Sequence, residues 1–140
     1  MATCTRTRLA ILDRNPHVRE FLCREFEALG FAATALRDSA ELAASLASQS
    51  PPEVVVVDPE ALDLTVQLPG PLAGRLANLA SRVPLVLHVF PEAEIPAGGF
   101  GAAGAQVVEK QADTRELNLA VRAALAGWGA RSSDRKGEGA

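Results

Sequence analysis

Short apolar runs alternate with segments of helical periodicity along this chain. Four runs rich in valine, leucine or isoleucine predict strands, at residues 8–12, 54–57, 85–89 and 106–109. A fifth run over 31–36 is rich in alanine and alternates only weakly, as in an edge strand. The runs at 54–57 and 85–89 are continuously apolar, which is typical of strands that are buried on both faces.

Helices are predicted between these runs by capping signals and by apolar residues at a period near 3.6. Asn15 and Pro16 provide an N-cap and a first helical residue, and Gly30 ends that helix. Asp38 and Glu41 have the spacing of a capping box for a second helix. Two further helices are predicted over 72–81 and over 114–128.

Two segments near the end of the chain are poor in regular pattern. Residues 91–104 contain two prolines and four glycines, so the fourth helix is predicted to be short or broken. Residues 129–140 are polar and contain glycine, which predicts a disordered tail. The sequence therefore predicts one domain over 1–128 and a tail over 129–140.

The order of these elements predicts an α/β fold with a parallel sheet covered by helices on both faces. In such sheets the functional crevice lies at the edge formed by the carboxyl ends of the strands. Asp13 directly follows the first predicted strand, Asp58 the third and Lys110 the last. We therefore expect two acids and a base to meet at that edge.

Composition and charge restrict the classes of function. The 140 residues are 48% hydrophobic, enough for one globular domain with a core. A net charge of −3 gives no support to nucleic acid or a membrane surface as a partner. No apolar run approaches the roughly 20 residues that cross a bilayer. Cys4 and Cys23 form neither a CxxC motif nor a disulfide framework, which favours a cytoplasmic location.

Four stretches, taken in order, resemble the response-regulator receiver domain of two-component signalling, over residues 8 to about 127. RLAILDRNPHVREFL resembles its first strand, acidic turn and first helix, VVVVDP the strand that ends in the phosphoacceptor, PLVLHVF the fourth strand, and GAQVVEK the fifth strand with its lysine. The resemblance implies a flavodoxin-like, doubly wound, five-stranded parallel sheet in the order 2-1-3-4-5. It also implies phosphorelay signal transduction with a histidine kinase or phosphotransfer protein and a downstream protein as partners.

The resemblance assigns roles to four positions. Asp58 matches the phosphoacceptor, and Asp13 matches the first of two acids that bind Mg²⁺ together with the acceptor. The backbone carbonyl of Glu60 matches a further metal ligand, and Lys110 matches the lysine that pairs with the acceptor and then with the phosphoryl group. These roles are physically consistent, because phosphoryl transfer to a carboxylate brings anions together and requires cations to neutralise them.

The sequence departs from the family pattern at four positions. Arg14 stands where the second acid is expected, which predicts an ion pair with Asp58 and weak or no Mg²⁺ binding. Val89 replaces the hydroxyl residue that contacts the phosphoryl group. Phe90 replaces a small residue at the entrance to the site, and Val107 replaces the mobile aromatic residue.

Other interpretations of these residues remain open. Asp58, Asp13 and Lys110 could form a purely structural ion-pair cluster, and the domain could then be a pseudo-receiver that docks partners without phosphorylation. His88, between apolar neighbours, is interpreted as a buried core or crevice histidine. A homodimer is possible through the last helix and strand. No Ser-His-Asp arrangement, phosphate-binding glycine loop or Cys/His metal cluster is present, so an enzyme is not predicted.

Overall fold

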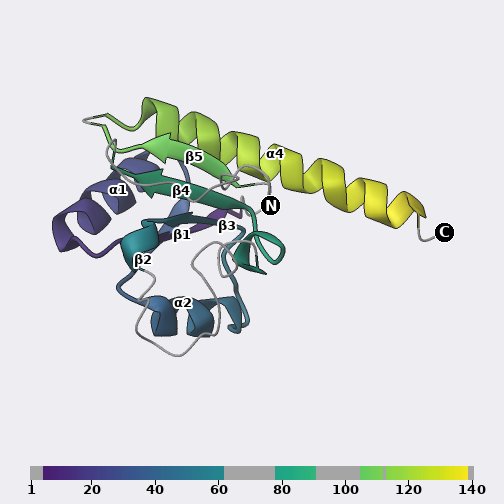
Figure 1. Ribbon diagram of the computed structural model, residues 1–140, viewed down its shortest axis with the longest axis horizontal. Coiled ribbons are helices and arrows are strands. Elements are labelled where there is room, and N and C mark those ends of the chain that lie inside the picture. Colours follow the sequence, from purple (N-terminus) through teal and green to yellow (C-terminus); the bar gives the residue numbers. More distant parts are fainter. Residues whose placement is uncertain (1–4, 62–77, 91–104, 112, 139–140) are drawn as a thin grey trace.

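A computed structural model describes residues 5–61, 78–90, 105–111 and 113–138, with only the backbone described for Glu60 and for 131–138. Its five parallel strands lie in the order β2-β1-β3-β4-β5. This sheet confirms the predicted flavodoxin-like fold and its strand order (Figure 1). The strands are β1 (Arg8–Leu12), β2 (Ala32–Leu36), β3 (Val54–Val57), β4 (Leu85–Val89) and β5 (Gln106–Glu109).

The predicted capping residues fix where the first two helices begin. Helix α1 (Pro16–Ala28) is capped by Asn15, whose side chain accepts a hydrogen bond from the His17 N–H at 2.9 Å. Helix α2 (Ser39–Leu46) is capped by Asp38, which accepts from the Glu41 N–H at 2.9 Å. Gly30 follows α1 with a φ of +97°, a conformation that favours glycine over all other residues.

The final helix extends further than predicted. Helix α4 runs over Arg115–Glu138, whereas the sequence predicted its end at Trp128. The prediction took the polar, glycine-containing composition of 129–140 as a sign of disorder, but Gly127 and Gly129 have no left-handed φ and continue the helix. A glycine inside a helix costs about 1 kcal/mol relative to alanine, and the alanine and arginine residues around these two favour helix. The backbone of 129–138 is helical here, where the sequence predicted a disordered tail over 129–140.

The remaining predicted helices are only partly described. Residues 78–80 are helical and form the end of the helix predicted over 72–81, with Leu79 buried. Residues 72–77 and the predicted short or broken helix over 91–104 lie outside the described residues. A short 3-10 helix, η1 (Pro59–Ala61), follows β3.

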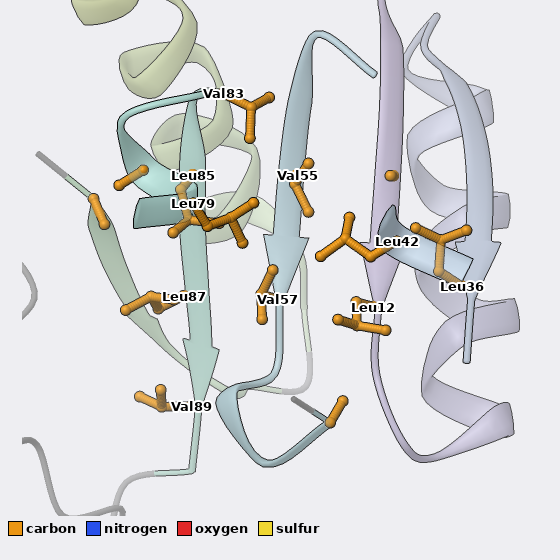
Figure 2. Close-up of a cluster of buried hydrophobic side chains, with 14 residues drawn as sticks. Leu12, Leu36, Leu42, Val55, Val57, Leu79, Val83, Leu85, Leu87 and Val89 are labelled. Carbon is orange, nitrogen blue, oxygen red and sulfur yellow. The ribbon is translucent and has the colours of Figure 1, made fainter. Parts of the chain in front are cut away.

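The four valines of β3 divide the core into two layers. Val55 and Val57 pack with residues of α2, and Val54 and Val56 pack with residues of α1 and α4. All four are buried, as the unbroken apolar run predicts. Figure 2 shows the first layer, in which Leu12, Val57 and Val89 lie near the carboxyl ends of their strands and Leu87 lies halfway along β4. In the described part of the chain, no helix has both the length and the apolar character that crossing a membrane requires.

Candidate functional site

The carboxyl edge of the sheet, meaning the edge formed by the carboxyl ends of its strands, carries the predicted acids. Leu12 of β1 and Val57 of β3 are paired in register, so the residues that follow them, Asp13 and Asp58, start from adjacent positions. The Asp58 N–H donates to the Leu12 carbonyl at 2.8 Å, which extends the β1–β3 ladder to the acid itself. The two carboxylates are therefore brought together by the sheet.

Lys110 reaches both acids from the far side of β4. Its Nζ lies 3.1 Å from Asp13 Oδ2 and 3.4 Å from Asp58 Oδ2. The prediction that these three side chains meet at one edge is confirmed by these distances. Their side chains are 11%, 3% and 4% exposed for Lys110, Asp13 and Asp58. Buried carboxylates are costly unless they are paired, so the ammonium group compensates for two desolvated anions at once.

Asp13 is held at both carboxylate oxygens. Oδ2 faces Lys110, and Oδ1 accepts a hydrogen bond from the Asn15 N–H at 2.9 Å. The Asp13 carbonyl accepts from Arg19 Nη1 at 2.7 Å. The turn between β1 and α1 is therefore held by Asn15, which also caps the helix, and by Arg19.

Arg14 lies on the solvent side of this cluster. Its Nε is 3.9 Å from Asp58 Oδ2, and its side chain is 57% exposed. The predicted Arg14–Asp58 ion pair is present, at the long end of the ion-pair range. Lys110 and Arg14 thus approach the same oxygen of Asp58 from the buried side and from the exposed side.

Phe90 lies over Lys110, a contact that the sequence reasoning missed. Lys110 Nζ is 4.3 Å from the centroid of the half-exposed Phe90 ring, within the range of a cation–π interaction. The strand register contained the signal. Val89 of β4 pairs with Glu109 of β5, so the residues that follow them, Phe90 and Lys110, start from adjacent positions. Val89 itself is buried in the layer next to α2, and Val107 is partly exposed.

His88 is buried beneath the cluster. It is 6% exposed, and in the described part of the chain its Nδ1 has no hydrogen-bond partner. Burial, with a further contribution from the positive charge of Lys110, lowers the pKa of His88 to about 4, against a smaller opposing effect of Asp13. His88 is therefore neutral at pH 7. Its burial agrees with the interpretation as a core histidine, although one nitrogen is unpaired within the described residues.

The donor set of the carboxyl edge does not fit Mg²⁺. This ion requires near-octahedral oxygen ligands, usually carboxylates and waters. Here the two carboxylates are already shared by Lys110 and Arg14, and both oxygens of Asp13 have partners. Among the described residues, no group of three or more His, Cys, Asp or Glu side chains could hold a metal ion. A metal-ligand role for Asp13, Asp58 and the Glu60 carbonyl therefore rests on the resemblance alone.

Comparisons with known proteins give a clear structural answer and no match from sequence. No family model and no curated protein matches the chain. The N-terminal domain of a response regulator/sensory box/GGDEF three-domain protein from Carboxydothermus hydrogenoformans is similar in structure. Its TM-score is 0.70 at 12% identity, covering 89% of this chain and 98% of that domain. The signal receiver domain of an HD domain-containing protein from Pseudomonas fluorescens Pf-5 gives 0.68 at 19% identity, covering 90% and 99%.

A third neighbour carries a ligand. The response regulator protein TrrA from Thermotoga maritima, in complex with Mg²⁺–BeF, has a TM-score of 0.63 at 20% identity, with 85% of this chain and 99% of that protein covered. All three neighbours are aligned over almost their whole length. This chain has the receiver-domain fold.

Three of the positions to which the resemblance assigns roles follow strands of this sheet. Asp58 follows the central strand β3, Asp13 follows the adjacent strand β1, and Lys110 follows the edge strand β5. The arrangement can present a carboxylate nucleophile beside two cations. Its electrostatics differ from those of a cation-binding acidic cluster, because Arg14 balances the second carboxylate.

Proposed function

We propose that this domain is a response-regulator receiver in phosphorelay signal transduction, with Asp58 as the phosphoacceptor. The observation that carries the proposal is the position of Lys110 Nζ, within 3.4 Å of both Asp58 and Asp13 at the carboxyl edge of a receiver fold. An ammonium group at this place stabilises the carboxylate before transfer and the phosphoryl group after it. The domain then acts as a cytoplasmic signalling module and not as an enzyme.

The partners follow from the proposed chemistry. A histidine kinase or a phosphotransfer protein supplies the phosphoryl group, and a downstream protein receives the signal. Val107 of β5 and Leu119 of α4 are exposed apolar side chains, and their elements form the face where we expect the downstream protein to bind. A second copy would use the same face if the domain forms a homodimer.

Incubation with acetyl phosphate followed by intact-mass measurement tests phosphoacceptance. The expected result is a gain of one phosphoryl group that hydroxylamine removes and that Asp58→Asn abolishes. Asp113→Asn is the matched control, since Asp113 is an exposed carboxylate paired with Arg115. A wild-type protein that gains no mass with any donor, with or without divalent cation, would contradict the proposal.

A second candidate is a docking module that functions without phosphorylation. Arg14 beside Asp58 and Phe90 over Lys110 favour it, because both side chains restrict access to the acceptor. In that case Asp58→Asn would leave partner binding unchanged, whereas a phosphorylation-dependent receiver would lose the response of partner affinity to acetyl phosphate.

A further inference from the structure

The charge balance at the carboxyl edge is the starting point. Asp13 and Asp58 contribute two negative charges, and Lys110 and Arg14 contribute two positive charges. The formal charges of these four described side chains therefore cancel before any reaction. A neutral cluster offers little attraction to a dication, whereas it can accept an anionic group at a moderate electrostatic cost.

The shape of Arg14 suits an incoming phosphoryl group. Guanidinium is planar, stays charged at all physiological pH values and presents forked N–H donors that match phosphate oxygens. The Arg14 side chain is 57% exposed and already approaches Asp58 Oδ2. It can therefore turn toward a group on Asp58 without being transferred out of water. Lys110, buried on the opposite side, supplies a second and more fixed charge.

A metal ion at Asp13 would meet the partners that this carboxylate already has. Asp13 Oδ2 is 3.1 Å from Lys110 Nζ, and Asp13 Oδ1 accepts the Asn15 N–H at 2.9 Å. A dication at this carboxylate would lie beside the Lys110 ammonium group and would compete with it, and with the Asn15 N–H, for the Asp13 oxygens. Its approach to Asp58 would bring it close to the Arg14 guanidinium.

We propose that Arg14 takes the place of a divalent cation, so that Asp58 accepts a phosphoryl group without metal. The inference rests on the proposed function of Asp58. With an acyl phosphate as donor, a carboxylate oxygen of Asp58 forms the new bond to phosphorus. The bond between phosphorus and the donor oxygen breaks, and the donor leaves as a carboxylate with the electron pair. No proton is transferred and no group is oxidised or reduced.

The experiment compares phosphorylation by acetyl phosphate in EDTA and in millimolar Mg²⁺, followed by intact mass over time. Wild-type protein is expected to react at the same rate in both buffers. Arg14→Ala is expected to lose about 10²-fold in rate in EDTA, the loss typical when one charged or polar donor to a transition state is removed. Arg14→Lys should retain part of the rate, and Arg14→Asp should react only with Mg²⁺.

Two controls make the comparison independent of folding and of reactivity. Arg115→Ala removes an exposed arginine at the start of α4 and should react like the wild type. Calorimetric titration with Mg²⁺ alone reads out the site directly, with no saturable binding expected for the wild type and saturable binding for Arg14→Asp. Arg14 lies on an exposed turn, so circular dichroism should show that its variants are folded.

The outcomes separate the two proposals. Phosphorylation of the wild type that requires Mg²⁺, or an Arg14→Ala rate equal to that of the wild type in EDTA, would overturn the role of Arg14 and leave Asp58 as the acceptor. A wild type that is unreactive in both buffers would overturn the acceptor role of Asp58 and, with it, the role of Arg14.

Discussion

The two edges of the sheet carry ion pairs of similar length in very different surroundings. At the amino edge, Arg8 Nη1 lies 3.2 Å from Glu53 Oε1, and the side chains are 36% and 42% exposed. At the carboxyl edge, Lys110 lies 3.1 Å from Asp13, and both side chains are largely buried. Exposed pairs contribute little to stability, whereas buried charges are costly when a partner is lost. Distance alone therefore does not separate a surface pair from a buried cluster.

Removing the cation from the carboxyl edge should have the largest effect. In Lys110→Met, Asp13 and Asp58 are left as two buried carboxylates close together, so the free energy of unfolding should fall by about 3–5 kcal/mol at pH 7. Denaturation in guanidinium chloride measures this loss, and the m-value should stay unchanged. A loss below about 1 kcal/mol would show that the buried pair contributes no more to stability than the exposed pair at the amino edge.

The buried histidine should make stability depend on pH. The pKa of His88 is about 4 in the folded protein and 6.5 ordinarily, so the unfolded chain gains a proton first as the pH falls. The free energy of unfolding should therefore decrease between pH 6.5 and 4, by about 3 kcal/mol in total from this group. The difference between wild type and His88→Leu across this range isolates the effect.

His17 is the matched control for that measurement. It lies in the first turn of α1 and is exposed, so His17→Gln should retain the pH dependence of the wild type. A His88→Leu variant with the same pH dependence as the wild type would show that His88 takes up its proton equally in the folded and unfolded states.

Removing the ring over Lys110 should weaken stability slightly and open the site. Phe90→Ala should lower the free energy of unfolding by about 0.5–1 kcal/mol, the value of an exposed cation–π contact. Its phosphorylation by acetyl phosphate should be faster than that of the wild type, because the ring no longer covers Lys110, which lies 3.4 Å from the acceptor. Phe21→Ala, which removes an exposed ring from α1, is the control and should leave the rate unchanged. An unchanged rate in Phe90→Ala would show that the ring does not restrict access.

The smallest effect is expected at the amino edge. Glu53→Gln should change the free energy of unfolding by less than about 1 kcal/mol, because both partners are partly exposed to water. Denaturation at low and high salt checks this, and the small difference between variant and wild type should shrink as salt screens the pair. A salt-independent loss of several kcal/mol would contradict the contrast between the two edges.

The sequence predicted the strands and the meeting of the three charged residues because strong local signals agreed with the global fold. The unbroken valines 54–57 can form only a buried strand in this context, and a parallel sheet brings the residues after its strands to one edge. Glycine was a weaker signal. Gly30 ends α1 because its φ is positive, whereas Gly129 continues α4. Residue type alone does not distinguish these two conformations.

The sequence predicted which charged residues meet at the site better than it predicted their contacts. The Phe90–Lys110 contact depends on the register of β4 against β5. Whether His88 Nδ1 has a hydrogen-bond partner among the described residues depends on what packs around it. Neither is encoded in spacing along the chain. The Arg14–Asp58 distance of 3.9 Å depends on the conformation of an exposed side chain, which spacing along the sequence does not specify.

The backbone at Asp58 is anchored on both sides. Its N–H donates to the Leu12 carbonyl at 2.8 Å, and its carbonyl accepts the Ala61 N–H at 2.9 Å. A bulky group attached to this carboxylate would therefore meet a stationary base. Its volume would be accommodated by the outer side chains of Arg14 and Phe90, each of which is at least half exposed to solvent. Any change of shape would then begin at the surface of the protein, where a second molecule can detect it.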